Sequence, residues 1–208
     1  MELTAMTVSQ YLDVLASDAP APGGGSASAL CGAQGAGLVA MVAGLTVGRA
    51  KYADFEQDCR KAAEEAGRLQ KELVASIDRD TEAFNRVSAA MKLPRETGEQ
   101  KAARRDAIAE ATLAATQVPF ATMGLAAQAL EVCRSIVGRS NPNAASDLGV
   151  AALNLLACVR GAWLNVLINL SGVRDENERE RFRAEGERIE SSAARLADEI
   201  YQSVKNSL

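Results

Sequence analysis

Apolar residues recur at intervals of three or four along most of the 208-residue chain. This period is typical of helices that turn one face to a core, and no segment alternates long enough to predict a strand. We expect helices over about residues 7–17, 26–47, 53–90, 97–116, 119–138, 146–170 and 175–208. The pattern therefore predicts an all-α fold, a multi-helix bundle with long antiparallel helices.

Capping residues mark several of these boundaries. Thr7 with Gln10, and Thr97 with Gln100, have the spacing of a capping box, in which each side chain satisfies a backbone N–H of the first turn. Pro119 has no backbone N–H, so we expect it to begin a helix or to kink one.

A run without charged side chains covers residues 27–48, which is long enough to span a bilayer. Most of its residues are Ala or Gly, which contribute little transfer free energy. Small side chains recur at helical spacing at Gly32, Ala36, Ala40, Ala43, Gly44 and Val47. We interpret the run as a buried central helix rather than a membrane span, with Ala40 and Gly44 in its helix contact.

Composition narrows the class of protein. The net charge of -4 and the small number of aromatic residues do not favour nucleic-acid binding. The four cysteines are far apart and a signal peptide is not apparent, which predicts reduced thiols in one cytoplasmic domain over residues 1–208. The chain has no histidine, so catalysis would depend on Asp, Glu, Lys, Tyr, Cys or backbone groups.

A glycine-rich segment precedes the uncharged run. Pro22 ends the preceding segment, and Gly23, Gly24 and Gly25 permit close approaches that a Cβ would block. Ser26 is a good N-cap, and the free N–H groups at a helix start can hold an anion or a polar ligand group. The segment predicts either a ligand-facing loop or a simple turn with a helix cap.

One carboxylate lies within the apolar stripe of the helix expected over residues 53–90. The stripe consists of Leu69, Leu73, Ile77, Asp80, Phe84, Val87 and Met91. Burial would raise the pKa of Asp80 and suit it to acid or base chemistry. The alternative is that Asp80 caps or cross-links neighbouring helices. Asp78 and Glu82 face elsewhere, and we expect them to be solvated.

A second polar stripe follows the turn predicted at residues 141–143. Its members are Asp147, Asn154, Cys158, Gly161, Asn165 and Asn169. Asp147 lies in the first turn, where it can act as a cap. Buried Asn side chains need hydrogen-bond partners. A neighbouring helix, another Asn or a bound heterocycle would serve, and helix packing is the favoured interpretation.

A series of short motifs occurs in a fixed order along the chain. The motifs are residues 22–26 (PGGGS), 51–52 (KY), 80–85 (DTEAFN), 93–94 (LP), 141–150 (NPNAASDLGV) and 165–169 (NVLIN). Together they resemble the cyclodeaminase/cyclohydrolase family of folate enzymes. This family includes the C-terminal domain of formiminotransferase-cyclodeaminase and the stand-alone bacterial methenyltetrahydrofolate cyclohydrolases. The resemblance extends from about Thr7 to Tyr201.

The resemblance implies an all-helical homodimer that acts on one-carbon tetrahydrofolates, with a folate substrate and no metal or other cofactor. Asp80 would be the catalytic acid/base, and Lys51 the cation near it. The residues that would bind the substrate are Gly23, Gly24, Gly25, Ser26, Tyr52, Asn85, Asn141, Asn143 and Asp147. This chain has Arg49-Ala50-Lys51 where members of the family often carry a denser lysine cluster.

Three functions remain open. The first is hydrolysis of 5,10-methenyltetrahydrofolate to 10-formyltetrahydrofolate, in which a carboxylate takes a proton from water. The second is the cyclodeaminase reaction, which makes the same methenyl compound from 5-formiminotetrahydrofolate and releases ammonia. The third is a non-catalytic helical binding module. The resemblance does not extend to a formiminotransferase domain, and we therefore expect the cyclohydrolase rather than the cyclodeaminase.

The length of the central helix constrains the site. Residues 26–47 would span about 33 Å at 1.5 Å per residue, so the two ends of the helix cannot hold one small ring. We expect the ends to serve different sites of a dimer, with Lys51 of one chain near the turns of another.

Overall fold

The computed structural model describes residues 2–208, and all regular elements within them are helical. The α-helices are α1 (Val8–Leu15), α2 (Gly24–Gly44), α3 (Glu56–Met91), α4 (Gly98–Ile136), α5 (Ala145–Leu170) and α6 (Glu176–Ser207). Short 3₁₀ helices are η1 (Leu3–Ala5), η2 (Ala50–Phe55) and η3 (Pro142–Ala144). The all-α prediction is confirmed.

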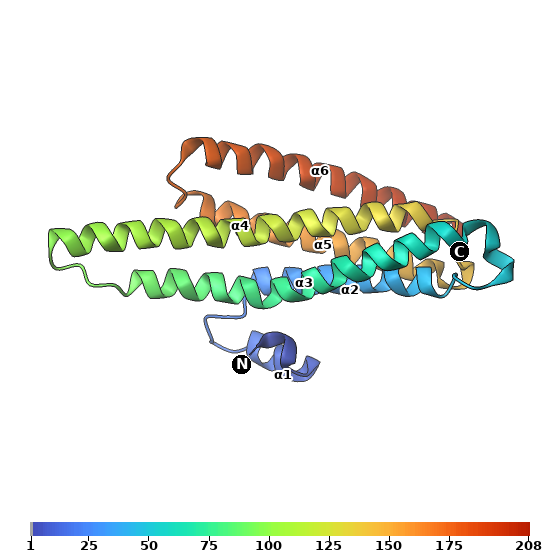
Figure 1. The fold of residues 1–208 in the computed structure, drawn as a ribbon, viewed down its shortest axis with the longest axis horizontal. Helices are drawn as coiled ribbons and strands as arrows, with labels where there is room; N and C mark the ends of the chain where they lie inside the picture. Colours follow the sequence, from blue (N-terminus) through green and yellow to red (C-terminus); the bar gives the residue numbers. More distant parts are fainter. Residues whose placement is uncertain (1) are drawn as a thin grey trace.

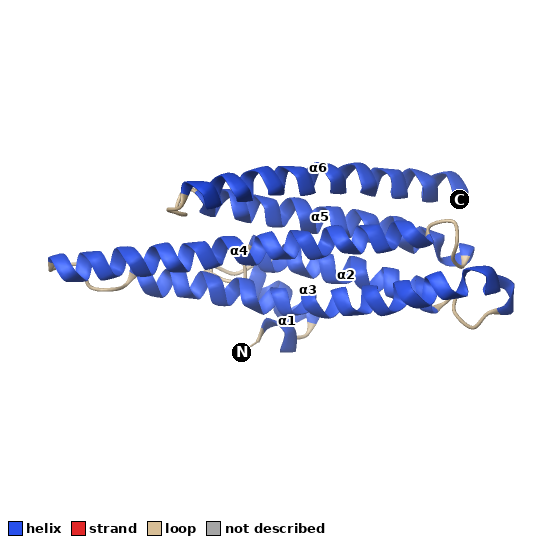
Figure 2. Cartoon of the chain, turned by 45° about the horizontal axis from the view of Figure 1, so that its top comes forward, coloured by secondary structure: helices blue, strands red, loops and turns tan. Residues whose placement is uncertain are grey.

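The long helices lie side by side in an elongated bundle (Figure 1). Helix α2 packs against α3 and α5, α4 packs against α3 and α5, and α6 covers α5 and α4. Figure 2 shows the hairpin between α3 and α4 projecting beyond the other helices at one end. This projection leaves Phe84 and Met91 exposed, so only the first half of the apolar stripe on α3 lies in the core.

The two predicted capping boxes are confirmed at the starts of α1 and α4. The prediction for Pro119 was wrong in part, because α4 is one uninterrupted helix with Pro119 inside it. Ser26 is not an N-cap either. Helix α2 begins at Gly24 with Gly23 at the N-cap position, which places Ser26 in the first turn, fully buried.

Helix α2 is the central helix that its composition predicts. By length and apolar composition, α2 and the Pro142–Leu170 segment would each be long enough to cross a membrane. Half of the most apolar part of α2 is buried among the other helices, as in the core helix of a bundle.

The close approach of α5 to α2 depends on Gly32 and Gly35 rather than on Gly44. A Cβ on Gly35 would lie 2.6 Å from Leu155 and 2.9 Å from the Ala151 carbonyl oxygen, whereas Gly44 is exposed with open space around it.

All four cysteines are free thiols, as predicted. Cys59, Cys133 and Cys158 are buried, and burial raises the pKa of Cys133 and of Cys158 to about 12. These thiols therefore behave as small apolar core side chains.

We expect Gly35→Ala to lower the free energy of unfolding by about 1–3 kcal/mol, because the added methyl group would push α2 and α5 apart. Chemical denaturation measures the change. Gly67→Ala is the matched control, since Gly67 lies within α3 with nothing within 4 Å of an added Cβ. This control should keep or slightly raise stability. Equal stability of the two variants would contradict the tight contact at Gly35.

Candidate active site

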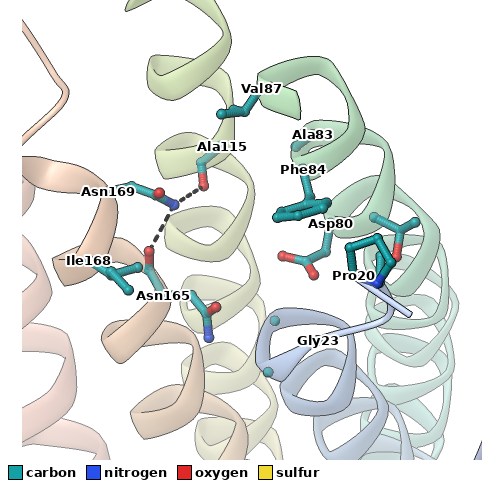
Figure 3. A pocket seen from close by; sticks show the side chains of 14 residues that line it. Pro20, Gly23, Asp80, Ala83, Phe84, Val87, Ala115, Asn165, Ile168 and Asn169 are labelled. Carbon is teal, nitrogen blue, oxygen red and sulfur yellow. Dashed lines mark hydrogen bonds between the residues drawn. The ribbon is translucent and has the colours of Figure 1, made fainter. Parts of the chain in front are cut away.

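A cavity of about 330 Å³ lies where α2 begins, between α3 and α5. Its lining residues include Gly23, Gly24 and Gly25 at the start of α2, Asp80, Thr81, Phe84 and Val87 from α3, Ala115 from α4, and Asn165, Ile168 and Asn169 from α5. Figure 3 shows Asp80 on one wall and the two asparagines on the wall opposite. The lining residues include no lysine or arginine.

The Asp80 carboxylate is held against the first turn of α2. A Cβ on Gly25 would lie 2.0 Å from Asp80 Oδ1, so the carboxylate fills the space that the glycine leaves. The Ser26 hydroxyl lies 3.0 Å from Asp80 Oδ2 and 2.9 Å from the Ile77 carbonyl oxygen. The carboxylate thus stands at a helix N-terminus, where partial positive charge favours an anion. The sequence left two interpretations of Asp80 open, a link between neighbouring helices and a residue of a site. The structure shows that Asp80 contacts α2 and also lines the cavity.

Burial dominates the electrostatics of Asp80. It raises the pKa of the carboxyl group above its ordinary value, while the Ser26 hydroxyl and backbone N–H act in the opposite direction. The other groups on the cavity wall are uncharged, so no cation from this wall offsets the cost of desolvation. A carboxyl group with a raised pKa in a cavity is suited to proton transfer.

Asn165 and Asn169 line the cavity opposite Asp80. The Asn165 side-chain nitrogen donates to the Gly161 carbonyl oxygen at 2.8 Å. The Asn169 nitrogen donates to the carbonyl oxygens of Ala115 and Asn165, each at 3.0 Å (Figure 3). Because carbonyl oxygens accept only, the hydrogen bonds assign the nitrogen atom of each amide. The side-chain oxygens therefore remain available to a ligand.

These two residues belong to the second polar stripe but were not among the predicted substrate-binding residues. The signal that could have found them was their position in that stripe and in the NVLIN motif. The favoured interpretation of the stripe, helix packing, holds for other members. A Cβ on Gly161 would lie 2.2 Å from the Ser28 hydroxyl oxygen, and Cys158 packs against Gly32.

A second cluster lies at the other end of α2. The Tyr52 hydroxyl donates to Asn141 Oδ1 at 3.1 Å, and the Asn143 backbone N–H donates to the same oxygen. The Lys51 ammonium lies 5.4 Å from the centre of the Tyr52 ring. Asp147 is in the first turn of α5, directly after η3. The structure thus brings together the predicted Lys51-Tyr52 and Asn141-to-Asp147 segments.

This second cluster is remote from the Asp80 cavity within one chain, because α2 is about 30 Å long. One chain therefore does not bring Lys51 to Asp80, and their meeting across a dimer stays a prediction. Asn85 is exposed on α3 and is not among the cavity-lining residues. The expectation that Asp78 is solvated was wrong in part. Its carboxylate accepts hydrogen bonds from the Leu3 backbone N–H and the Thr4 hydroxyl, both at 2.6 Å.

Comparison with known proteins identifies the family of the chain. The family model described as formiminotransferase-cyclodeaminase matches residues 7–188. The chain belongs to this family. The match to the formiminotransferase-cyclodeaminase family confirms the resemblance that the motifs predicted.

Individual relatives carry two different names. The chain is 40% identical over 200 residues to a methenyltetrahydrofolate cyclohydrolase from Methylorubrum extorquens, covering 96% of both chains. It is 34% identical over 163 residues to a formimidoyltransferase-cyclodeaminase from Rattus norvegicus, of which it covers 30%. In structure it is similar to a formiminotetrahydrofolate cyclodeaminase from Thermotoga maritima, with a TM-score of 0.80, 26% identity, and coverage of 100% and 98% of the two chains.

The raised pKa of Asp80 predicts an effect on stability. Burial disfavours the ionised form of Asp80 in the folded protein, so Asp80→Asn should be equally or more stable at pH 7. The difference should shrink as the pH falls through the raised pKa of the folded state and should vanish below the ordinary value of 3.8. Denaturation at several pH values measures it.

The control is Glu82→Gln, which changes an exposed carboxylate on the same helix and should show no such pH dependence. A loss of stability in Asp80→Asn at pH 7 would mean that capping of α2 by the charge outweighs its desolvation.

Proposed function

We propose that the protein hydrolyses 5,10-methenyltetrahydrofolate to 10-formyltetrahydrofolate. The observation that carries the proposal is a cavity whose polar side chains are Asp80, Thr81, Asn165 and Asn169, without a basic residue on its wall. Such a wall favours a ligand that is cationic or donates N–H groups. The methenyl carbon of the substrate belongs to a cationic amidinium group, and the pterin ring presents N–H donors.

Asp80 would act as the proton carrier. Its carboxylate stabilises the cation and takes a proton from the water that attacks the methenyl carbon. As the bond between this carbon and N5 breaks, the protonated Asp80 returns a proton to N5. The hydroxyl group of the adduct loses its own proton when the formyl carbonyl forms, so the net reaction releases one proton. Phe84, Ile168 and Val87 supply an apolar surface beside the reacting groups.

The cyclodeaminase reaction is the second candidate, because N10 attack and loss of ammonia would use the same carboxylate. The similarity to a cyclodeaminase structure over the whole chain supports it. The higher identity of the cyclohydrolase relative, 40% against 26%, favours hydrolysis. A non-catalytic module accounts less well for a desolvated carboxylate facing a cavity.

The decisive assay follows the near-ultraviolet absorbance of methenyltetrahydrofolate, with the spontaneous rate subtracted. We expect the wild-type protein to accelerate its loss, and Asp80→Asn to reduce turnover by about 10²-fold or more. Glu82→Gln should keep wild-type turnover. In parallel, ammonia release from 5-formiminotetrahydrofolate tests the alternative reaction.

Near-normal turnover by Asp80→Asn would remove Asp80 from the mechanism. Ammonia release without hydrolysis of the methenyl compound would replace the cyclohydrolase by the cyclodeaminase.

We also propose a homodimer, as the resemblance implies. Helix α5 leaves Val150, Leu153, Leu164 and Ile168 exposed at helical spacing along one face. Ile168 lines the Asp80 cavity, whereas Val150 lies one turn from Asp147 in the second cluster. A second chain lying antiparallel on this face would cover the apolar stripe. It would also bring its Lys51 end to the Asp80 cavity of the first chain, where the glutamate tail of a folate would meet Lys51.

Subunit mixing tests this arrangement. If each site combines Asp80 of one chain with Lys51 of the other, a heterodimer of Asp80→Asn and Lys51→Ala contains one intact site and one doubly changed site. Random 1:1 exchange of subunits should then recover about a quarter of wild-type activity from two weak variants. No recovery after verified exchange would place Lys51 outside the Asp80 site of the partner, and a monomer in sedimentation would reject the dimer.

A further inference from the structure

The proline inside α4 leaves one carbonyl group of the cavity wall without its helical hydrogen bond. In an α-helix the backbone N–H of residue 119 would donate to the carbonyl oxygen of residue 115. Pro119 has no N–H, so it leaves the Ala115 carbonyl without this donor. The structure fills this position with the side chain of Asn169 from α5, whose nitrogen donates to the Ala115 oxygen at 3.0 Å.

This contact fixes the orientation of Asn169. Its nitrogen carries two hydrogens, one directed to the Ala115 oxygen and the other to the Asn165 oxygen on its own helix. Both donors are therefore occupied by carbonyl groups of two different helices. The side-chain oxygen is the remaining polar atom of a residue that lines the cavity.

We propose that Pro119 is a positioning residue, which frees the Ala115 carbonyl so that Asn169 is held with its side-chain oxygen as a fixed acceptor for an N–H group of the bound ligand. The inference deepens the proposed function and rests on it for the identity of that ligand, a tetrahydrofolate whose pterin ring donates N–H groups. Pro119 is buried and does not line the cavity, so it would act only through Asn169.

The test is a double-mutant cycle on Pro119 and Asn169. Pro119→Ala restores the backbone N–H, which competes with Asn169 for the Ala115 oxygen. We expect KM for methenyltetrahydrofolate to rise about fivefold to tenfold, with a smaller change in kcat, as for the loss of one hydrogen bond. Asn169→Leu should raise KM at least as much. The double variant should be no worse than Asn169→Leu alone, because Pro119 acts through Asn169.

If Pro119 had only a structural role, Pro119→Ala would change the melting temperature rather than KM. Alanine is the better residue in a helix interior, so Pro119→Ala should keep its melting temperature while KM rises. Gln117→Ala is the control: it changes an exposed residue on the same turn of α4 and should leave KM unchanged. Wild-type KM in Pro119→Ala or in Asn169→Leu, or additive effects in the double variant, would overturn the inference.

A measurement without substrate separates this inference from the proposed function. The side-chain amide protons of Asn169, assigned by their loss in Asn169→Leu, should exchange with solvent about tenfold faster in Pro119→Ala than in the wild-type protein. Equal exchange would reject the positioning role even if the enzyme hydrolyses the folate. Faster exchange in a protein without this activity would keep the positioning role and reject only the cyclohydrolase.

Discussion

The Asp80 carboxylate occupies the space beside Gly25 in which any other residue would carry a Cβ. This contact joins the first turn of α2 to the middle of α3, and it fixes both the start of the central helix and the wall of the cavity. A side chain at position 25 would force the two helices apart or turn the carboxylate away. The glycine and the acid therefore form one unit, in which backbone geometry and electrostatics depend on each other.

The same contact explains how a desolvated acid is tolerated. The N-terminus of α2 contributes partial positive charge and the Ser26 hydroxyl contributes a donor, which together offset part of the cost of burial. Burial outweighs these contributions, so the pKa of Asp80 is higher than that of an aspartate in water. An acid in this state can take up a proton at a pH closer to neutrality than an exposed aspartate can, which is the property that a proton carrier requires.

The opposite wall depends on glycines and a proline, which are residues that weaken an isolated helix. Glycines at 32, 35 and 161 let α2 and α5 approach closely, so the start of α2 faces the asparagines near the end of α5. Pro119 removes a hydrogen bond from α4, and a side chain of α5 takes its place. Residues that weaken single helices thus create contacts between helices, as expected where a site takes precedence over local stability.

Local pattern alone determined much of this protein. The helical period predicted the long helices, although it divided α4 at Pro119. The capping boxes fixed two helix starts, and the apolar stripe singled out Asp80, which lines the cavity. These features depend on residues within a few turns of each other, so they can be read from one sequence.

The tertiary structure decided the rest. It showed that the Ser26 hydroxyl contacts the Asp80 carboxylate instead of capping α2. It also showed that α4 continues through Pro119 and that Asn165 and Asn169 line the cavity. It also separated Lys51 from Asp80 within one chain. Each of these depends on which atom of a distant helix supplies a hydrogen-bond partner or occupies a space. The helical period shows which face a residue lies on, but not what that face meets.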